Sequence, residues 1–257
     1  MAQSWSLGVD IGASATKAVL LDDAGQVRAR ALRKSGADFE AAAQACLEEV
    51  ATAVALKPSN IKRVVATGYG RRSVDFATST VTEITCHARG CYQNFPHAIT
   101  IVDIGGQDNK VIVLADGGDR RNFKMNRKCA AGTGAFLEEI ANRLDTPLAA
   151  LNELARQATG EVELGSFCTV FAKTELLKLI AQGTPLAEMA RAAYRSVVKR
   201  ILEMDPLAGE VVMTGGVVAH NPIIVELVSA ALGRDVLVPH HPQYTGALGA
   251  ALIARDA

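Results

Sequence analysis

The sequence predicts an α/β fold made of two duplicated domains, and two observations support that prediction. First, segments 7–17 and 101–110 are alike: each is an apolar strand ending in Asp-Ile-Gly, followed by a short polar turn and a second β-branched run. The copies lie 93 residues apart, which suggests two related domains that face each other. Second, strand patterns alternate with helical patterns along the chain, as is typical of α/β proteins.

In the first half, apolar spacing and proline breakers define the elements. Helices are predicted over 38–56 and 85–94, each ended by a proline shortly afterwards. A strand is predicted over 61–66, running into the turn Thr67-Gly68-Tyr69-Gly70. We expect these elements to form a first domain over residues 1–97.

The second half continues the alternation of strands and helices. Strands are predicted over 121–125, 211–213 and 236–238. Helices are predicted over 135–144, 147–157, 170–182, 185–204, 222–232 and 246–255. We expect a second domain over 98–243, with the last helix, within 244–257, packing back on the first domain.

Composition excludes several classes of function. The 257 residues are 49% apolar and 21% charged, which is ordinary for a globular protein. The 27 basic and 27 acidic side chains leave no positive excess for a nucleic-acid backbone. The chain has no apolar run of about 18 residues, which a membrane span requires, and no basic and apolar leader. A cytoplasmic protein without a nucleic-acid or membrane partner is therefore expected.

The glycine-containing turns indicate a polyphosphate site, because glycine allows backbone N–H donors to approach phosphates closely. Ser14, Thr16 and Lys17 add hydroxyl groups and a cation to the first turn. Asp10 and Asp103 end strands where a carboxylate would hold Mg²⁺, directly or through water. In the second turn, Gln107 and Asp108 are candidates to position the attacking water. A third turn, Thr214-Gly215-Gly216, follows a buried strand, where the chain can pass close to an adenosine.

A single Asp-x-Gly after a strand is a common hairpin turn, but two copies with Lys17 and a later Gly-Gly turn form a more specific pattern. From residue 7 to its end, the chain resembles the five-motif pattern of the actin, sugar-kinase and Hsp70-type ATPases. The resemblance implies a duplicated actin-like (ribonuclease H-like) ATPase fold around a cleft for ATP or ADP. A dinucleotide-binding Rossmann domain is the alternative fold, but its Gly-x-Gly-x-x-Gly opening is missing.

The five cysteines divide by their surroundings. Cys129 and Cys168 each precede a predicted helix, where the positive helix N-terminus favours a metal-binding thiolate. A [4Fe–4S] cluster needs four thiolates, so a twofold dimer sharing one cluster would suffice. Composition and spacing alone favour buried structural cysteines at these two positions equally. Cys46 lies on an apolar helix face and is interpreted as a core side chain. Cys86 and Cys91 are alternative ligands within one chain, but the pattern of their segment is typical of an amphipathic helix.

Four motifs carry a closer resemblance: Lys-Cys-Ala-Ala-Gly-Thr-Gly (128–134), Cys-Thr-Val-Phe-Ala (168–172), Val-Val-Met-Thr-Gly-Gly-Val (211–217) and Gln-Tyr-Thr-Gly-Ala-Leu-Gly-Ala-Ala-Leu (243–252). With these motifs the chain resembles the activators of 2-hydroxyacyl-CoA dehydratases and the ATPase subunits of benzoyl-CoA reductase. The resemblance implies a homodimeric iron–sulfur ATPase with Mg²⁺ and one [4Fe–4S] cluster per dimer, held by Cys129 and Cys168. It also implies an electron donor, ferredoxin or flavodoxin, and ATP-driven transfer at low potential to a partner iron–sulfur enzyme.

The resemblance completes the list of candidate site residues. Asp10, Asp103 and Gln107 are the expected catalytic residues. The expected nucleotide-binding residues are Gly12, Ala13, Ser14, Ala15, Thr16, Lys17, Gly105, Gly106, Asp108, Gly132, Thr133, Gly134, Gly215, Gly216, Val217 and Gln243.

The chain also departs from the family pattern. After Cys-Thr-Val-Phe-Ala, the dehydratase activators continue with Glu-Ser-Glu, whereas this chain has Lys173-Thr174-Glu175. A charge therefore changes sign one turn from the expected cluster, and the identity of the partner enzyme stays open. The alternatives are a benzoyl-CoA reductase-type ATPase subunit in a larger complex, a small-molecule kinase of the same fold, and a non-catalytic nucleotide-dependent scaffold.

Overall fold

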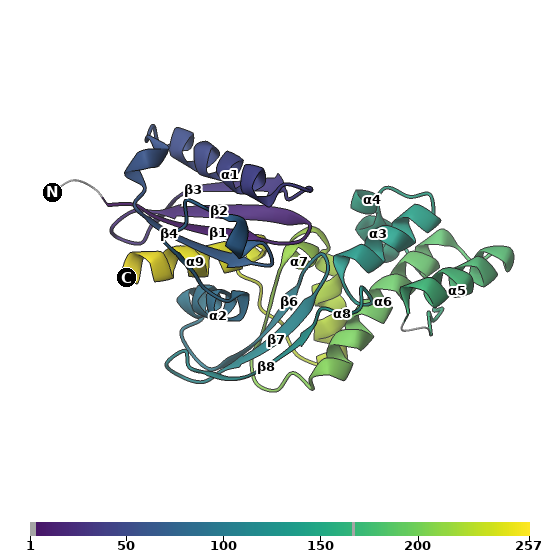
Figure 1. Ribbon diagram of the computed structural model, residues 1–257. Coiled ribbons are helices and arrows are strands. Elements are labelled where there is room, and N and C mark those ends of the chain that lie inside the picture. The colour runs from purple at the N-terminus through teal and green to yellow at the C-terminus, as the bar shows by residue number, and fades with distance from the viewer. Residues whose placement is uncertain (1–3, 166–167) are drawn as a thin grey trace. The chain divides into compact units, whose positions relative to one another are not determined.

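The computed structural model describes residues 4–165 and 168–257. Met1 to Gln3 and Ser166 to Phe167 lie outside the described residues. The chain divides into two compact units (Figure 1). Unit 1 comprises Met1–Ala98, Leu114–Arg121 and Gln243–Ala257, and unit 2 comprises Ile99–Val113 and Asn122–Pro242.

Unit 1 contains a sheet in the order β3-β2-β1-β4-β5. β1 is antiparallel to β2, with which it forms the first hairpin, and parallel to β4, which the chain reaches by a crossover connection. The strands are β1 (Ser6–Ile11), β2 (Ala15–Leu21), β3 (Val27–Lys34), β4 (Arg63–Gly68) and β5 (Ser79–Thr80). The helices are α1 (Phe39–Ala53), α2 (Glu83–Asn94) and α9 (Thr245–Asp256), with short 3₁₀ turns at Pro58–Asn60, Arg71–Ser73 and Pro242–Tyr244.

Helices cover both faces of the unit 1 sheet. α1 packs on β2 and β3, and α9 packs on β1 and β4 with α2 beside it (Figure 1). α1 begins after Asp38, whose carboxylate accepts a hydrogen bond from the Ala41 N–H at 2.9 Å and so satisfies a free helix donor. The sheet therefore has an apolar layer on each face. β1 and β2 bury side chains on both faces, as strands enclosed by helices do.

Unit 2 contains a sheet in the order β8-β7-β6-β9, in which β6 and β9 are parallel. The strands are β6 (Ile99–Ile104), β7 (Asn109–Leu114), β8 (Arg120–Asn126) and β9 (Val211–Thr214); the tip of the β7–β8 hairpin belongs to unit 1. The helices are α3 (Gly134–Arg143), α4 (Leu148–Arg156), α5 (Thr169–Ala181), α6 (Leu186–Met204), α7 (Gly216–His220) and α8 (Pro222–Leu232).

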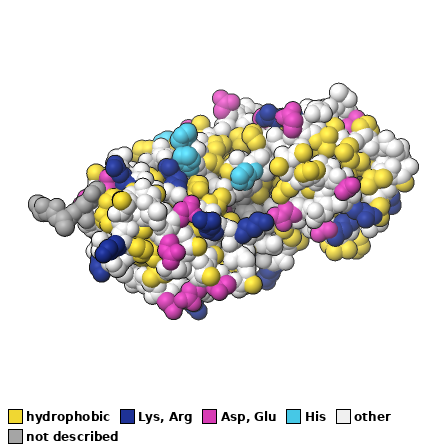
Figure 2. Space-filling model, turned by 90° about the horizontal axis from the view of Figure 1, so that it is seen from above, with side chains coloured by type: hydrophobic (Ala, Val, Ile, Leu, Met, Phe, Trp, Pro, Cys, Tyr) yellow, Lys and Arg dark blue, Asp and Glu magenta, His cyan; other side chains and the backbone are white. Residues whose placement is uncertain are grey.

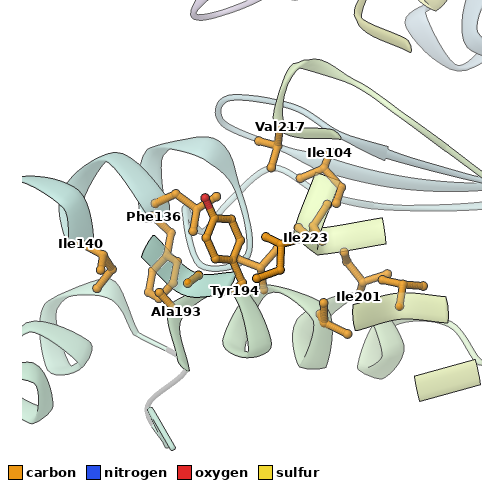
Figure 3. Packing of buried hydrophobic residues seen from close by; sticks show 14 of the residues in the cluster. Ile104, Phe136, Ile140, Ala193, Tyr194, Ile201, Val217 and Ile223 are labelled. Carbon is orange, nitrogen blue, oxygen red and sulfur yellow. The ribbon is translucent and has the colours of Figure 1, made fainter. Parts of the chain in front are cut away.

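A large apolar core joins the sheet of unit 2 to its helices. Tyr194 of α6 is fully buried and lies between Phe136 of α3 and Ile223 of α8 (Figure 3). Its hydroxyl donates a hydrogen bond to the Asn221 side chain, which gives the buried phenol a partner. This core fixes the starts of α3, α7 and α8 relative to the ends of β6 and β9, where the candidate site lies.

The predicted helices are all present with ends shifted by up to three residues. The strand predicted over 236–238 is wrong: Leu237 forms only an isolated bridge with Val212, and Pro239, which has no N–H to donate, follows at once. β3, β5 and α7 were not predicted. β3 carries a period-2 pattern, with Ala29 and Ala31 buried between exposed arginines. The described helices include none whose apolar stretch reaches the length that a bilayer requires.

Candidate functional site

The first Asp-Ile-Gly motif forms a tight hairpin in unit 1. The register of β1 and β2 places Lys17 directly opposite Asp10, and the Lys17 Nζ lies 3.3 Å from the Asp10 Oδ2. Between them the turn closes with a hydrogen bond from the Gly12 N–H to the Ala15 carbonyl at 3.0 Å. The Asp10 residue is only 5% exposed, so its lysine partner balances a charge that water reaches poorly.

Ser35, which lies outside the motif, stabilises this turn through its side chain. The Ser35 hydroxyl, at the end of β3, donates to the Gly12 carbonyl at 2.6 Å and lies 3.0 Å from the Thr16 hydroxyl. Thr16 is thus buried in a hydrogen-bonded position, whereas Ala13 and Ser14 at the tip of the turn are exposed. The tip keeps backbone and hydroxyl donors at the surface, as a phosphate site needs.

The second motif repeats the first within unit 2. Here the Gly105 N–H donates to the Asp108 carbonyl at 2.9 Å, the same turn bond at the equivalent position. Lys110 is 3% exposed, with its Nζ 3.1 Å from Asp103 and 2.9 Å from Asp108. Thr214, at the end of β9, donates its hydroxyl to Asp103 at 3.0 Å. Gln107 is exposed at the tip of the turn.

The Gly132-Thr133-Gly134 segment is attached to this second turn. The first amides of α3 donate to it: the Gly134 N–H to the Gly105 carbonyl at 3.0 Å and the Ala135 N–H to the Gly106 carbonyl at 2.8 Å. The Asn109 amide donates to the Gly132 carbonyl at 2.6 Å. The Gly105-Gly106 turn, the start of β7 and the start of α3 therefore share one hydrogen-bond network in unit 2.

The Gly215-Gly216 turn lies against the same edge. Gly215 has φ 102°, and a Cβ there would lie 2.3 Å from the Ile104 carbonyl, so only glycine fits between β9 and β6. A side-chain carbon of Val217 lies 3.2 Å from the position that a Gly134 Cβ would take. Unit 2 thus brings together the predicted positions around Asp103, Gly134 and Gly215.

Other predicted residues lie elsewhere. Asp10, Gly12, Ala13, Ser14, Ala15, Thr16 and Lys17 all belong to unit 1. Gln243 is half-buried at the boundary, assigned to unit 1, and its neighbour Pro242 accepts a hydrogen bond from the Gly215 N–H at 3.0 Å. The predicted nucleotide-binding residues therefore form two groups, one within each unit.

The cysteines fall into two groups by burial. Cys46, Cys86 and Cys91 have no exposed surface, and burial raises the pKa of the Cys46 thiol to about 11 and that of Cys86 to about 12. Such thiols stay protonated near neutral pH and act as core side chains. Cys129 and Cys168 are partly exposed and both belong to unit 2.

Both partly exposed cysteines lie near helix starts. Cys168 is the N-cap residue of α5. Cys129 lies in the loop between β8 and α3, where the Asn126 amide donates to its carbonyl at 3.1 Å. The other end of that loop is Gly132 to Gly134, which is bonded to the Gly105-Gly106 turn. The Cys129 loop is therefore continuous with a predicted phosphate-binding turn.

The charge change at Lys173 is neutralised locally. The Lys173 Nζ on α5 lies 2.5 Å from the Glu139 carboxylate on α3, and both side chains are about 40% exposed. The pair links the two helices that follow the partly exposed cysteines. Across the residues 4–165 and 168–257, no three His, Cys, Asp or Glu side chains are grouped to hold a metal ion.

Sequence reasoning missed several residues of the site, namely Ser35, Asn109 and Lys110. Lys110 had a visible signal, because it follows Asp103 at the spacing by which Lys17 follows Asp10. Ser35 gave none, because it reaches the first turn from the end of β3, which is remote in sequence.

The family model described as the BadF/BadG/BcrA/BcrD ATPase family matches residues 7–254. The chain belongs to this family. A curated relative in Anaerotignum propionicum, the activator of lactoyl-CoA dehydratase, is 42% identical over 256 residues, covering 98% of this chain and 98% of the relative.

Two solved structures of related activators resemble this member of the BadF/BadG/BcrA/BcrD ATPase family over nearly its whole length. Component A of (R)-2-hydroxyglutaryl-CoA dehydratase from Acidaminococcus fermentans matches with a TM-score of 0.92 and 37% identity, over 98% of each chain. The activator of 2-hydroxyisocaproyl-CoA dehydratase from Clostridium difficile, solved with bound ADPNP, matches with a TM-score of 0.91 and 37% identity, over 98% of this chain and 94% of the other.

The fold expectation is confirmed: the chain has the two-sheet, mixed α/β architecture of actin-like ATPases and sugar kinases. More distant sugar kinases share that fold alone. The expected enzyme class, an ATPase, is confirmed by the family, and relatives are named as activators of 2-hydroxyacyl-CoA dehydratases.

Proposed function

We propose that this chain is an ATP-dependent activator that passes a low-potential electron to a 2-hydroxyacyl-CoA dehydratase-type enzyme. The electron comes from ferredoxin or flavodoxin and passes through a [4Fe–4S] cluster shared by two copies of the chain. One observation carries the proposal: the loop that bears Cys129 ends on the glycine turn expected to bind phosphate. A change at the nucleotide therefore has a direct covalent and hydrogen-bonded route to the thiol.

The two Asp-Ile-Gly hairpins are the proposed phosphate-binding turns, one from each unit. Both present exposed tips, at Ser14 and Gln107, and in the first turn Lys17 adds a cation that suits phosphate. Asp10 and Asp103 offer the oxygen ligands that Mg²⁺ prefers and fit such an ion, directly or through water, because both carboxylates are held at the ends of strands next to the turns. Gln107 is the proposed residue that orients the attacking water.

The thiols of the chain fit one half of a cluster site. Cys129 and Cys168 are the partly exposed cysteines, whereas the other three are buried in cores, so one chain offers two accessible thiols and two chains offer four. A bound cluster would supply one-electron storage. Cys168 would hold it at the start of α5, where the helix N-terminus favours negative charge, and Cys129 would hold it from the loop before α3.

An exposed apolar surface supports the proposed homodimer. Val170 and Phe171 follow Cys168 on α5 and are 67% and 65% exposed, and Leu177 and Ile180 of the same helix are also exposed. Hydrophobic side chains gather over the end of unit 2 that carries α5 (Figure 2). A surface that adjoins half of a cluster site is expected to meet the copy that supplies the other half.

The decisive experiment is anaerobic purification followed by an absorption spectrum and by iron and sulfide analysis. We expect a brown protein with about four iron atoms per dimer, as one [4Fe–4S] cluster requires. Cys129→Ser and Cys168→Ser should each abolish the iron, because each removes two of the four thiolates. Cys46→Ala, which deletes a fully buried thiol of unit 1, is the matched control and should retain it.

The same preparation separates the alternatives. ATP hydrolysis by a colourless protein, even after anaerobic reconstitution with iron and sulfide, would contradict the electron-transfer proposal and favour a small-molecule kinase. Co-purification with a sister subunit would indicate a benzoyl-CoA reductase-type complex. With a dehydratase as partner, electron transfer that is as fast with ADP as with ATP would contradict the coupling.

A further inference from the structure

The carboxylate of Asp10 is enclosed by elements distant in sequence. A Cβ added to Gly68, at the end of β4, would lie 2.5 Å from the Asp10 Oδ1, so the backbone of β4 touches that oxygen closely. The other oxygen, Oδ2, lies 3.3 Å from the Lys17 Nζ. Each oxygen of the carboxylate therefore has a different neighbour, and its rotation is restricted.

A third neighbour comes from α2 and α9. A Cβ on Gly246, at the start of α9, would lie 3.0 Å from the His87 Nε2 and 3.1 Å from the Asp10 Oδ2. The imidazole and the carboxylate thus converge on one point beside Gly246, which has no side chain to separate them. His87 is 6% exposed and Asp10 is 5% exposed, so this approach takes place inside unit 1.

The charge of Asp10 also acts on the thiol that precedes His87 on α2. Burial is the main cause that raises the pKa of Cys86, and the charge of Asp10 raises it further. Cys86 precedes His87 on α2, so this segment of the helix lies within electrostatic reach of the Asp10 carboxylate in a water-poor environment.

We propose that His87 is a positioning residue that holds the Asp10 carboxylate in the orientation needed for metal-dependent ATP hydrolysis. The inference rests on the proposed function, in which Asp10 serves the Mg²⁺ of the nucleotide. An imidazole nitrogen that faces a carboxylate oxygen orients it as an outer partner orients a metal ligand. Gly246 takes part by leaving the space in which the two groups meet.

The test compares His87→Leu with His87→Gln. Leucine fills the space without a polar atom, whereas the glutamine amide reaches close to the position of Nε2. We expect His87→Leu to lower kcat for ATP hydrolysis about tenfold, to leave the KM for ATP within about twofold, and to weaken Mn²⁺ binding in the presence of ADP about tenfold, as for outer partners of metal ligands. His87→Gln should restore most of both losses. Mn²⁺ binding is read by electron paramagnetic resonance of the free ion.

Two further variants keep the test interpretable. Gly246→Ala adds a methyl carbon 3.0 Å from the His87 Nε2 and 3.1 Å from the Asp10 Oδ2, which displaces both groups, and should weaken Mn²⁺ binding in the same way with His87 intact. His97→Gln makes the glutamine change at an exposed histidine after α2 and should match the wild-type chain.

Mn²⁺ affinity and kcat equal to wild type in His87→Leu, or a lower melting temperature as its sole effect, would overturn the role of His87. Absence of ATP hydrolysis in the wild-type chain would instead contradict the proposed function, and the Mn²⁺ measurement would still decide on His87.

Discussion

Buried ion pairs define the candidate site at the scale of single residues. Lys110 is 3% exposed and contacts two carboxylates, those of Asp103 and Asp108. Charges removed from water are costly unless they are paired, and the loss of one partner leaves the other charge uncompensated. An exposed pair at the same distance is worth far less, because water screens it. Burial rather than distance should therefore decide how much such a pair matters.

Lys110→Met tests this reasoning against Lys124→Met. The Lys124 Nζ lies 3.1 Å from Asp205, the same distance as that from Lys110 to Asp103, but the Lys124 side chain is 45% exposed. We expect Lys110→Met to lower the free energy of unfolding by about 3 kcal/mol and Lys124→Met by at most about 1 kcal/mol. Urea unfolding followed by circular dichroism measures both, and equal losses in the two variants would contradict the argument.

At the scale of elements, the packing of α9 in unit 1 depends on glycines that face backbone. A Cβ on Gly249 of α9 would lie 1.7 Å from the Cys86 carbonyl, and one on Gly90 of α2 would lie 2.2 Å from the Thr245 carbonyl. On the sheet side, a Cβ on Gly8 of β1 would lie 2.1 Å from the Ala247 carbonyl. Backbone cannot yield as a flexible side chain can, so these contacts fix the separation of α9, α2 and β1. The same contacts bring Gly246 and His87 to Asp10.

Gly249→Ala should therefore destabilise unit 1 although alanine favours helices more than glycine does. We expect a loss of about 3 kcal/mol, because the added methyl group overpacks a rigid contact. Gly165→Ala is the matched control: among the described residues, the nearest atoms to its Cβ would be those of the Glu175 carboxylate, at 3.9 Å. Thermal unfolding of both variants gives the answer; a melting temperature at or above that of wild type in Gly249→Ala would refute the packing argument.

At the scale of the whole molecule, the surface of unit 2 bears on the oligomeric state. Formal net charge is zero, and acidic and basic side chains intermingle on the face seen in Figure 2. Long-range electrostatic attraction is therefore a weak cause for two copies to associate. The exposed apolar side chains of α5 offer a different cause. Burying this apolar area beside Cys168 against a second copy lowers the free energy of the dimer.

Phe171→Asp is expected to dissociate the dimer, raising its dissociation constant at least about tenfold, because a carboxylate would have to be buried in the interface. Iron content should fall with it, since each copy supplies two of the thiolates. Phe123→Asp makes the same change at a phenylalanine of β8 that is 45% exposed and should leave the dimer intact. Analytical ultracentrifugation under anaerobic conditions reads the mass; a dimer that persists in Phe171→Asp would place the interface elsewhere.

The α/β class, the two Asp-Ile-Gly hairpins, nearly all the helices and the ATPase family could be predicted from the amino-acid sequence, because these depend on local periodicity, turn chemistry and motif spacing. The sequence also singled out Cys129 and Cys168, which the structure leaves partly exposed while it buries Cys46, Cys86 and Cys91. The roles of the individual site residues stay predictions.

Contacts between residues that are distant in sequence became visible in the folded chain and not before. The attachment of Gly134 to the Gly105 turn, the pairing of Lys173 with Glu139, and the approach of His87 to Asp10 all join elements that no short-range pattern relates. The strand predicted over 236–238 is wrong because Leu237 forms only an isolated bridge with Val212, and Pro239, which follows Val238, has no N–H to extend the pairing. Such contacts arise from close packing of whole elements, where glycines such as Gly246 and Gly249 set the approach, and packing is a property of the folded chain rather than of its local sequence.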